Sequence, residues 1–505
     1  MKDSTPKVMN TAKRKLTINA ASAIIQVAFT AVLYFFLYKY LLNSIGIKQL
    51  GVWSLILSFS SIANLANFGI TSGLVKFVAE YLTEDDKSKL GKLIFTSIIS
   101  MAILFTIVSL LVFFGAQYFL HLVIDKEFLK IALLILPFSL ASLSINAVAG
   151  VLTSVLEGYQ KNYLRNFIYI FSGLFMFLLV LLLTPAYQLK GVAIAQVCQA
   201  VFILIVALVL IYRLSPYNRF KYWKWSRQSF NELFNYGYKF QVVSISQLLY
   251  EPTTKLLLSK FGGLALLGHY EMATRLVSQF RALLVNANQV VIPVVAENSK
   301  TKSKKELHDF FNKMNRFLIL FTLPFSTLLI ILSPFISIIW IGSFEMDFVF
   351  SLIILSISTA FNIMCGPSYF SSMGEGRLTI LVITHLAIAI MNLILGYVLG
   401  IFAGGYGIIS AWGISLSIGS TFLIIVYSKS ISFNFKTVFL DNVILLLMVS
   451  LVISFCSLSV YFLLSYSLTV KAFFSCIMIF LLIPIILKNP EFKSLFQKNK
   501  SIKVV

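Results

Sequence analysis

The chain has 505 residues, of which 59% are hydrophobic and 12% are charged, and its formal net charge is +22. A soluble domain carries about 25% charged residues, so this composition excludes one and indicates an all-α polytopic membrane protein. The basic surplus does not indicate nucleic-acid binding, because Lys and Arg lie in short loops between apolar runs and form no basic domain.

The apolar runs predict about fourteen transmembrane helices, since about 20 apolar residues cross a bilayer. In chain order they cover residues 16–42, 50–79, 93–121, 128–156, 163–184, 190–212, 232–260, 265–296, 315–341, 347–373, 378–402, 405–428, 438–466 and 469–487. The first run is too long for the apolar part of a signal peptide, and we expect it to be retained as a helix.

The distribution of basic residues predicts the orientation of these helices. Most of the 41 Lys and Arg residues fall in the two termini and in the even-numbered loops. Because basic loops stay on the cytoplasmic side, both termini are expected to be cytoplasmic. One missed helix would invert every later loop, so the regular pattern also supports the count of fourteen.

The chain also contains a long internal repeat. Leu50 to Glu80 aligns without a gap on Leu267 to Glu297, at an offset of 217 residues. The offset spans six helices, an even number, so both halves enter the membrane with the same orientation and form parallel six-helix lobes. The expected parts are an N-terminal lobe (1–213), a cytoplasmic linker (214–231), a C-terminal lobe (232–430), and helices 13 and 14 with a basic tail (431–505).

Three motifs follow one another along the first half. They are Gly51-Val-Trp with the later segment Asn67-Phe-Gly-Ile-Thr-Ser-Gly-Leu-Val-Lys-Phe-Val-Ala-Glu, the turn Leu156-Glu157-Gly158-Tyr-Gln-Lys, and Gly191-Val-Ala-Ile-Ala. In this order, and with fourteen spans, they resemble the O-antigen and capsule repeat-unit flippases of bacteria. Those proteins belong to the multidrug/oligosaccharidyl-lipid/polysaccharide exporter superfamily. The resemblance covers about residues 10–430, but many relatives carry an acid where this chain has Asn67.

The resemblance implies two lobes arranged as a V around a central cavity, and alternating access. It implies translocation of an undecaprenyl-diphosphate-linked oligosaccharide from the inner to the outer leaflet of the bacterial cytoplasmic (inner) membrane, for lipopolysaccharide or other polysaccharide biosynthesis. The implied partners are the lipid-linked oligosaccharide, membrane lipids and other polysaccharide-assembly proteins, and no cofactor is implied.

Ionisable residues inside the spans are concentrated on helices 232–260 and 265–296. Such residues are expensive in a bilayer and usually face a cavity or a partner. Positions equally distant from the turn at Gly262-Gly263 lie at similar depth, which predicts charge pairs between Glu251 and Arg275 and between Lys255 and Glu271. These four residues either clamp the two helices together or bind substrate when the lobes open.

Arg281 has no acid at matching depth on the neighbouring helix, where Ser244, Ile245 and Ser246 stand. A guanidinium near the middle of a span needs water or an anion, and its planar fork suits phosphate oxygens. We therefore expect Arg281 to bind the diphosphate. An acid on another helix and a misplaced span are the alternatives.

Neutral polar residues are candidate sugar contacts. In the first half, Ser58 and Asn64 stand where the second half has Arg275 and Arg281, and helix packing by small polar residues is the alternative interpretation. Lys76 either reaches the headgroups or guides an incoming phosphate. The candidate substrate contacts are Arg281, Arg275, Asn64, Asn67, Lys76, Asn286, Asn288 and Gln289.

The sequence has no signature of an enzyme or of a metal site. It has no Walker loop and no GxSxG, and its four cysteines lie singly in apolar runs. The remaining hypotheses are a flippase, a drug or metabolite antiporter of the same superfamily, and a membrane polymerase or ligase. A cation exporter would need acids at its centre and a polymerase a large outer loop, so Arg281 and the short outer loops favour the flippase.

Overall fold

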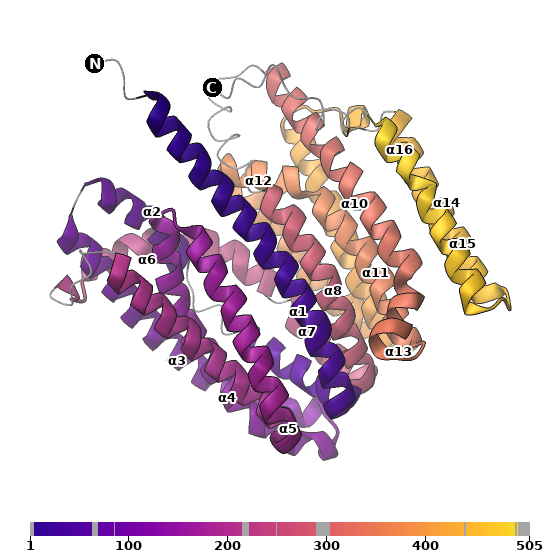
Figure 1. Ribbon diagram of the computed structural model, residues 1–505, viewed down its shortest axis with the longest axis horizontal. Helices are drawn as coiled ribbons and strands as arrows, with labels where there is room; N and C mark the ends of the chain where they lie inside the picture. Colours follow the sequence, from indigo (N-terminus) through magenta and orange to yellow (C-terminus); the bar gives the residue numbers. More distant parts are fainter. Residues whose placement is uncertain are drawn as a thin grey trace. The chain divides into compact units, whose positions relative to one another are not determined.

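The computed structural model describes residues 5–62, 69–84, 86–214, 222–248, 250–288, 304–438, 441–489 and 492 (Figure 1). Within these ranges the chain is helical almost throughout and contains no strand. The expected all-α class is therefore confirmed.

The helices of the first half of the chain are α1 (Thr5–Ile62), α2 (Ile70–Thr83), α3 (Lys87–Val123), α4 (Lys126–Gly158), α5 (Asn162–Leu214), α6 (Arg227–Leu248), α7 (Tyr250–Phe261) and α8 (Gly263–Asn288). Those of the second half are α10 (Lys304–Ile341), α11 (Met346–Met364), α12 (Gly366–Gly374), α13 (Leu378–Ser430), a 3-10 turn (Phe435–Val438), α14 (Asp441–Leu463), α15 (Leu468–Phe480) and α16 (Leu482–Lys488).

In the described ranges, nine helical segments are long and apolar enough to cross a membrane. Three of them contain a residue with non-helical backbone angles, at Gly46 in α1, Gln188 in α5 and Gly404 in α13, so each divides into two spans. Together with the pair α6–α7 and with α8, these segments agree with the expected count of about fourteen. The chain is therefore a multi-pass membrane protein.

The kinks fall at equivalent places in the two halves. Gly46 has φ 77° and Gly263 has φ 79°, and the two are 217 residues apart. Gln188 has φ 49° and Gly404 has φ 58°, at an offset of 216. Positive φ values of this kind favour glycine, which has no Cβ to clash with the backbone. The repeat seen in the sequence is thus present in the bends of the backbone.

The described helices group into two compact units, one of Met1–Glu271 with Gly400–Gly405 and one of Met272–Leu399 with Tyr406–Val505. The boundary falls inside α8, directly after Glu271. The lobes expected from the sequence divide instead at the linker 214–231, and that division stays a prediction.

The core of the first unit joins α2 to its neighbours. Leu74 and Val78 of α2 pack in one cluster with Leu93 of α3, Leu152 of α4 and Leu233 of α6, all of which are buried. Gly158 lies against Val78 so closely that an added Cβ would overlap that side chain. Small residues at such crossings let helix backbones approach, as in other membrane proteins.

The core of the second unit centres on α10. Phe311 and Ile319 of α10 pack with Tyr427 of α13 and Phe433 beyond it. A second cluster joins α10 to the C-terminal helices, with Leu446 of α14 among its buried members. α14 and α15 form a hairpin at the yellow end of the colour scale (Figure 1), tied by a buried hydrogen bond of 2.9 Å between the hydroxyls of Ser457 and Ser475.

The two Glu-Gly turns are built alike. Glu157 forms an ion pair with Arg165 at the end of α4. Glu375 pairs with Arg377 at 2.8 Å and accepts a hydrogen bond of 2.8 Å from the Tyr427 hydroxyl. In both turns the carboxylate ties the end of one helix to the beginning of the next.

Candidate functional site

The second unit contains the guanidinium singled out from the sequence. Arg281 lies on α8 and is exposed. Its Nε donates a hydrogen bond of 2.9 Å to Oδ1 of Asn362, in the last turn of α11. Among the described residues Arg281 forms no ion pair, so its partner is a neutral amide.

The partner amide is held in turn by a third helix. Nδ2 of Asn362 donates to the hydroxyl of Ser420 on α13 at 3.4 Å. Cys365, Tyr369 and His385 are also close enough to Arg281 to interact with it electrostatically. The Tyr369 ring meets His385 edge on, at 5.8 Å between centroids. None of these side chains is an acid.

The backbone beside Asn362 is interrupted. α11 ends at Met364 and α12 begins at Gly366, with Pro367 in its first turn. Proline has no N–H to continue the helical ladder and clashes with the preceding turn, so it breaks the helix here. The apolar run predicts a single span over 347–373, whereas the structure divides it at Cys365. Transporters often place their binding sites beside such discontinuous helices.

The first unit holds a buried charge cluster. Lys255 Nζ of α7 lies 2.7 Å from Glu271 Oε2 of α8, and both side chains are almost completely buried. Glu271 also accepts hydrogen bonds from the hydroxyls of Tyr38, at 3.0 Å, and Ser54, at 2.7 Å. The structure thus brings Lys255 and Glu271 together and adds Tyr38 and Ser54 of α1, which were not predicted from the sequence as members of this cluster.

The other expected charge pair has a different outcome. Glu251 lies 2.5 Å from Lys255 on the same helix and its side chain is 52% exposed. Arg275 is partly buried and belongs to the second unit, whereas Glu251 belongs to the first. The Glu251–Arg275 pair therefore stays a prediction.

Lys76 lies on α2 with its side chain exposed. Its Nζ is 4.9 Å from the centroid of the Phe77 ring and 4.8 Å from that of Tyr236 on α6. Cation–π contacts of this kind hold a cation at a surface without neutralising it. Lys76 belongs to the first unit, whereas Arg281 belongs to the second.

The candidate sugar contacts are not placed by the structure. Asn64, Asn67 and Gln289 lie outside the described residues, and of Asn286 and Asn288 only the helical backbone is described. Their roles stay predictions. The described ranges also contain no group of three or more His, Cys, Asp or Glu side chains suited to a metal ion.

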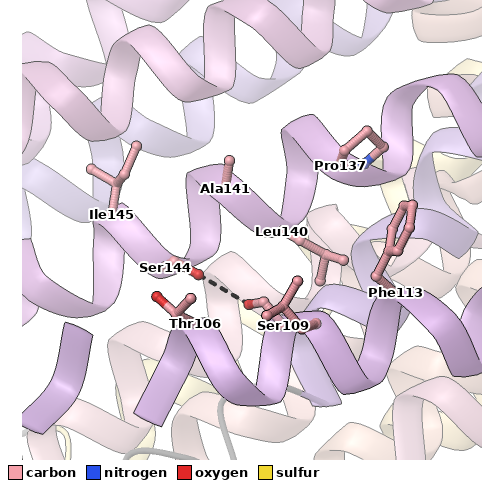
Figure 2. A pocket seen from close by; sticks show the side chains of 9 residues that line it. Thr106, Ser109, Phe113, Pro137, Leu140, Ala141, Ser144 and Ile145 are labelled. Atoms are coloured by element: carbon pink, nitrogen blue, oxygen red, sulfur yellow. Dashed lines mark hydrogen bonds between the residues drawn. The ribbon is translucent and has the colours of Figure 1, made fainter. Parts of the chain in front are cut away.

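An apolar cavity of about 450 Å³ lies between α3 and α4 (Figure 2). Phe113 and Leu140 line it near Pro137, and a hydrogen bond of 3.0 Å joins the hydroxyls of Ser109 and Ser144 beside it. The lining carries no charged side chain. It therefore suits hydrocarbon and not a phosphate group.

Comparison with known families gives one match. The family described as "Polysaccharide biosynthesis protein" matches residues 45–344, which is more than half of the chain. A comparison with curated proteins gives no match.

Solved transporters share the fold. An inward-facing multidrug resistance MATE family transporter of the MOP superfamily aligns with a TM-score of 0.72 and 14% identity, over 81% of this chain and 98% of that chain. The lipid II flippase MurJ in an inward closed conformation aligns with a TM-score of 0.69 and 16% identity, over 92% of this chain and 98% of that chain. A MOP superfamily transporter from Pyrococcus furiosus aligns at 0.60 and 13%, over 83% and 96%. Likenesses at this identity establish a shared fold.

Proposed function

We propose that this chain, which belongs to the polysaccharide biosynthesis protein family, is a flippase for a lipid-linked oligosaccharide. The substrate would be an undecaprenyl-diphosphate-linked repeat unit, moved from the inner to the outer leaflet of the bacterial cytoplasmic membrane for surface polysaccharide synthesis. The likeness to a protein named as a lipid II flippase supports this substrate class.

The observation that carries the proposal is the environment of Arg281. Its guanidinium is exposed, and its hydrogen-bond partner is the neutral amide of Asn362. A cation without a counter-charge in a span is costly unless it meets water or an anionic ligand. Arg presents paired N–H groups that match phosphate oxygens, so a diphosphate is the ligand that this site suits best.

The buried cluster of the first unit argues against a site for cationic drugs. Glu271 is the acid that a cation would seek there, but it is buried and already paired with Lys255. Lys255 also contacts the half-exposed carboxylate of Glu251, so both acids of the cluster are engaged by the same ammonium group. The chemistry of the described residues therefore favours an anionic substrate over the drug antiporter that is the alternative within the superfamily.

The transport cycle that we propose is alternating access between two lobes, with both termini in the cytoplasm. The oligosaccharide and diphosphate would pass through the protein while the polyprenyl tail stays in the lipid. With the cytoplasm negative, outward movement of each negative charge gains about 2.3 kcal/mol per 100 mV. The membrane potential would then drive export without an obligatory ion antiport.

Deletion of the gene in the host cell tests the proposal. Loss of surface polysaccharide, with accumulation of the lipid-linked oligosaccharide in the inner leaflet, is the expected phenotype. The plasmid-borne chain should restore the glycan. Unchanged surface glycan together with increased sensitivity to cationic drugs would contradict the flippase and identify the antiporter.

A further inference from the structure

The contact between Arg281 and Asn362 fixes the orientation of the guanidinium. The amide oxygen of Asn362 accepts from Nε of Arg281 at 2.9 Å, and its amide nitrogen donates to Ser420 at 3.4 Å. The amide oxygen is thus engaged by α8 and the amide nitrogen by α13. These two hydrogen bonds fix the plane of the amide. An Arg side chain with four rotatable bonds gains a defined direction from such an anchor.

We propose that Asn362 is a positioning residue that aims Arg281 at a phosphate-bearing ligand and leaves its positive charge intact. This inference rests on the proposed function, because it concerns the same cation. With Nε engaged, the four N–H groups on the two terminal nitrogens remain for a bidentate contact with phosphate oxygens.

The chemical identity of the anchor matters for this role. An acid at position 362 would hold Arg281 more firmly, but the pair would have no net charge and would attract an anion weakly. Asparagine has nearly the same shape and donates and accepts without carrying charge. A neutral anchor thus orders the guanidinium while the site remains cationic.

The other neighbours of Arg281 preserve this charge. Cys365 and Tyr369 interact with it electrostatically, and so does His385. None of the three is a carboxylate, so none brings a standing negative charge to the site. Within the part of the chain that the structure describes, the cation is surrounded by neutral groups.

The break between α11 and α12 explains how Asn362 holds its place. Asn362 lies in the last turn of α11, and its backbone carbonyl accepts a hydrogen bond of 3.1 Å from the thiol of Cys365. The Gly366-Pro367 pair then starts α12. Asn362 therefore lies at the end of a helix. From this place its side chain reaches one partner on α8 and another on α13.

Binding measurements on the purified full chain test the proposal. The affinities for undecaprenyl diphosphate and for neutral undecaprenol are compared, and their ratio reports recognition of the charged group. The wild-type chain should favour the diphosphate by about tenfold or more, the factor expected for one hydrogen bond to a charged group. Asn362→Asp should bring the ratio close to one without lowering the melting temperature.

Two further variants separate anchoring from folding. Asn362→Gln keeps the amide and should retain more of the ratio than Asn362→Ala, which leaves Arg281 charged but unaimed. This comparison also decides the case if Asn362→Asp fails to fold, since equal ratios for Gln and Ala would overturn the proposal. Asn235→Asp, which adds the same charge at an exposed position of α6, is the matched control and should behave as wild type.

The arms of the experiment also identify the source of the phosphate. Free pyrophosphate should compete with undecaprenyl diphosphate in the wild-type chain and much less in Asn362→Asp. Equal competition by phosphatidylglycerol would indicate bulk phospholipid as the ligand and overturn the proposal. A wild-type ratio in Asn362→Asp would overturn the role of Asn362 alone, whereas a wild-type ratio in Arg281→Ala would overturn the phosphate site itself.

Discussion

Ser54 donates a hydrogen bond of 2.7 Å to Glu271, and these two residues occupy the same position in the two halves of the repeat, 217 residues apart. Tyr38 and Lys255 are related by the same offset, and both contact the same carboxylate. Equivalent positions of the two repeats are therefore in direct contact with one another. One half supplies two neutral hydroxyls there, and the other supplies the two ions.

Loss of one hydroxyl from this cluster should destabilise the protein. Ser54→Ala leaves a buried carboxylate with one hydrogen bond fewer, which costs about 1–3 kcal/mol. Ser60→Ala is the matched control on the same helix, because the Ser60 hydroxyl donates to the backbone carbonyl of Ile56 one turn earlier. Thermal unfolding in detergent should show a lower melting temperature for Ser54→Ala than for the control, and equal values would contradict the role of the hydroxyl.

The backbones beside the cluster approach too closely for a side chain. A Cβ at Gly51 would overlap the backbone oxygen of Leu264, and one at Gly268 would overlap that of Ile47, and these two contacts are equivalent under the repeat. Gly51→Ala and Gly268→Ala should each lower stability by about 1–3 kcal/mol, since the helices must separate.

Gly150→Ala is the control for the glycine variants. A Cβ there would meet nothing within 4 Å, and the residue lies inside α4. Alanine is the better helix former by about 1 kcal/mol, so this variant should raise the melting temperature. If Gly51→Ala is as stable as Gly150→Ala, the close approach of the two halves is refuted.

The kink in α5 carries a strained residue. Gln188 has φ 49° and ψ −132°, and Gly404 at the equivalent kink has φ 58° and ψ −142°. These angles are close to those of the first central residue of a type II′ turn, which strongly favours glycine. Gln188→Gly should therefore stabilise the protein by about 1 kcal/mol, and Gly404→Gln should destabilise it. A lower melting temperature for Gln188→Gly would be inconsistent with strain at this kink.

The start of α3 should respond to pH. Oδ1 of Asp86 accepts a hydrogen bond of 2.9 Å from the backbone amide of Lys89, and this bond holds the pKa of the carboxyl below its usual range. A carboxyl whose pKa is lower in the folded state contributes its full stability above its ordinary pKa of about 3.9, and loses it as the pH falls through the folded value.

Two variants report on this cap. Asp86→Ala should cost about 1 kcal/mol at neutral pH, as for other lost helix caps. Asp86→Asn keeps the acceptor without titrating, so the stability advantage of the wild type over Asp86→Asn should shrink as the pH falls through the lowered folded-state pKa of Asp86. Hydrogen exchange of the first turn of α3 measures both effects, and a pH-independent difference would contradict the assignment.

The sequence predicts the helical class and the approximate number of spans well, because long apolar runs and an internal repeat can be recognised in the chain itself. Gly46 and Gly263, which have positive φ, both lie in the short gaps between predicted spans. The boundaries of the expected helices therefore fall close to the observed bends. Depth matching around the turn at Gly263 also pointed to Lys255 and Glu271, which the structure joins.

The partner of Arg281 was missed for a physical reason. Matching by depth compares Arg281 with the neighbouring helix, whereas the structure supplies a neutral amide from α11, 81 residues away. No local pattern pairs residues so distant. The Gly366-Pro367 break one turn beyond Asn362 was the available signal, because polar residues beside a broken span often line a binding site. The contacts of Tyr38 and Ser54 with Glu271 were likewise not predicted, although the offset of the repeat relates these two residues to Lys255 and Glu271.

Transport in proteoliposomes measures the central claim most directly. The purified chain is reconstituted with an undecaprenyl-diphosphate-linked oligosaccharide, and the appearance of the glycan on the opposite leaflet is followed with a membrane-impermeant glycosidase. Lys429→Gln, which removes an exposed cation at the end of α13, is the control and should transport at the wild-type rate. Arg281→Ala should reduce the rate by about tenfold or more, and Arg281→Lys should restore only part of it. An undiminished rate in Arg281→Ala would contradict the assignment of this residue as the diphosphate ligand.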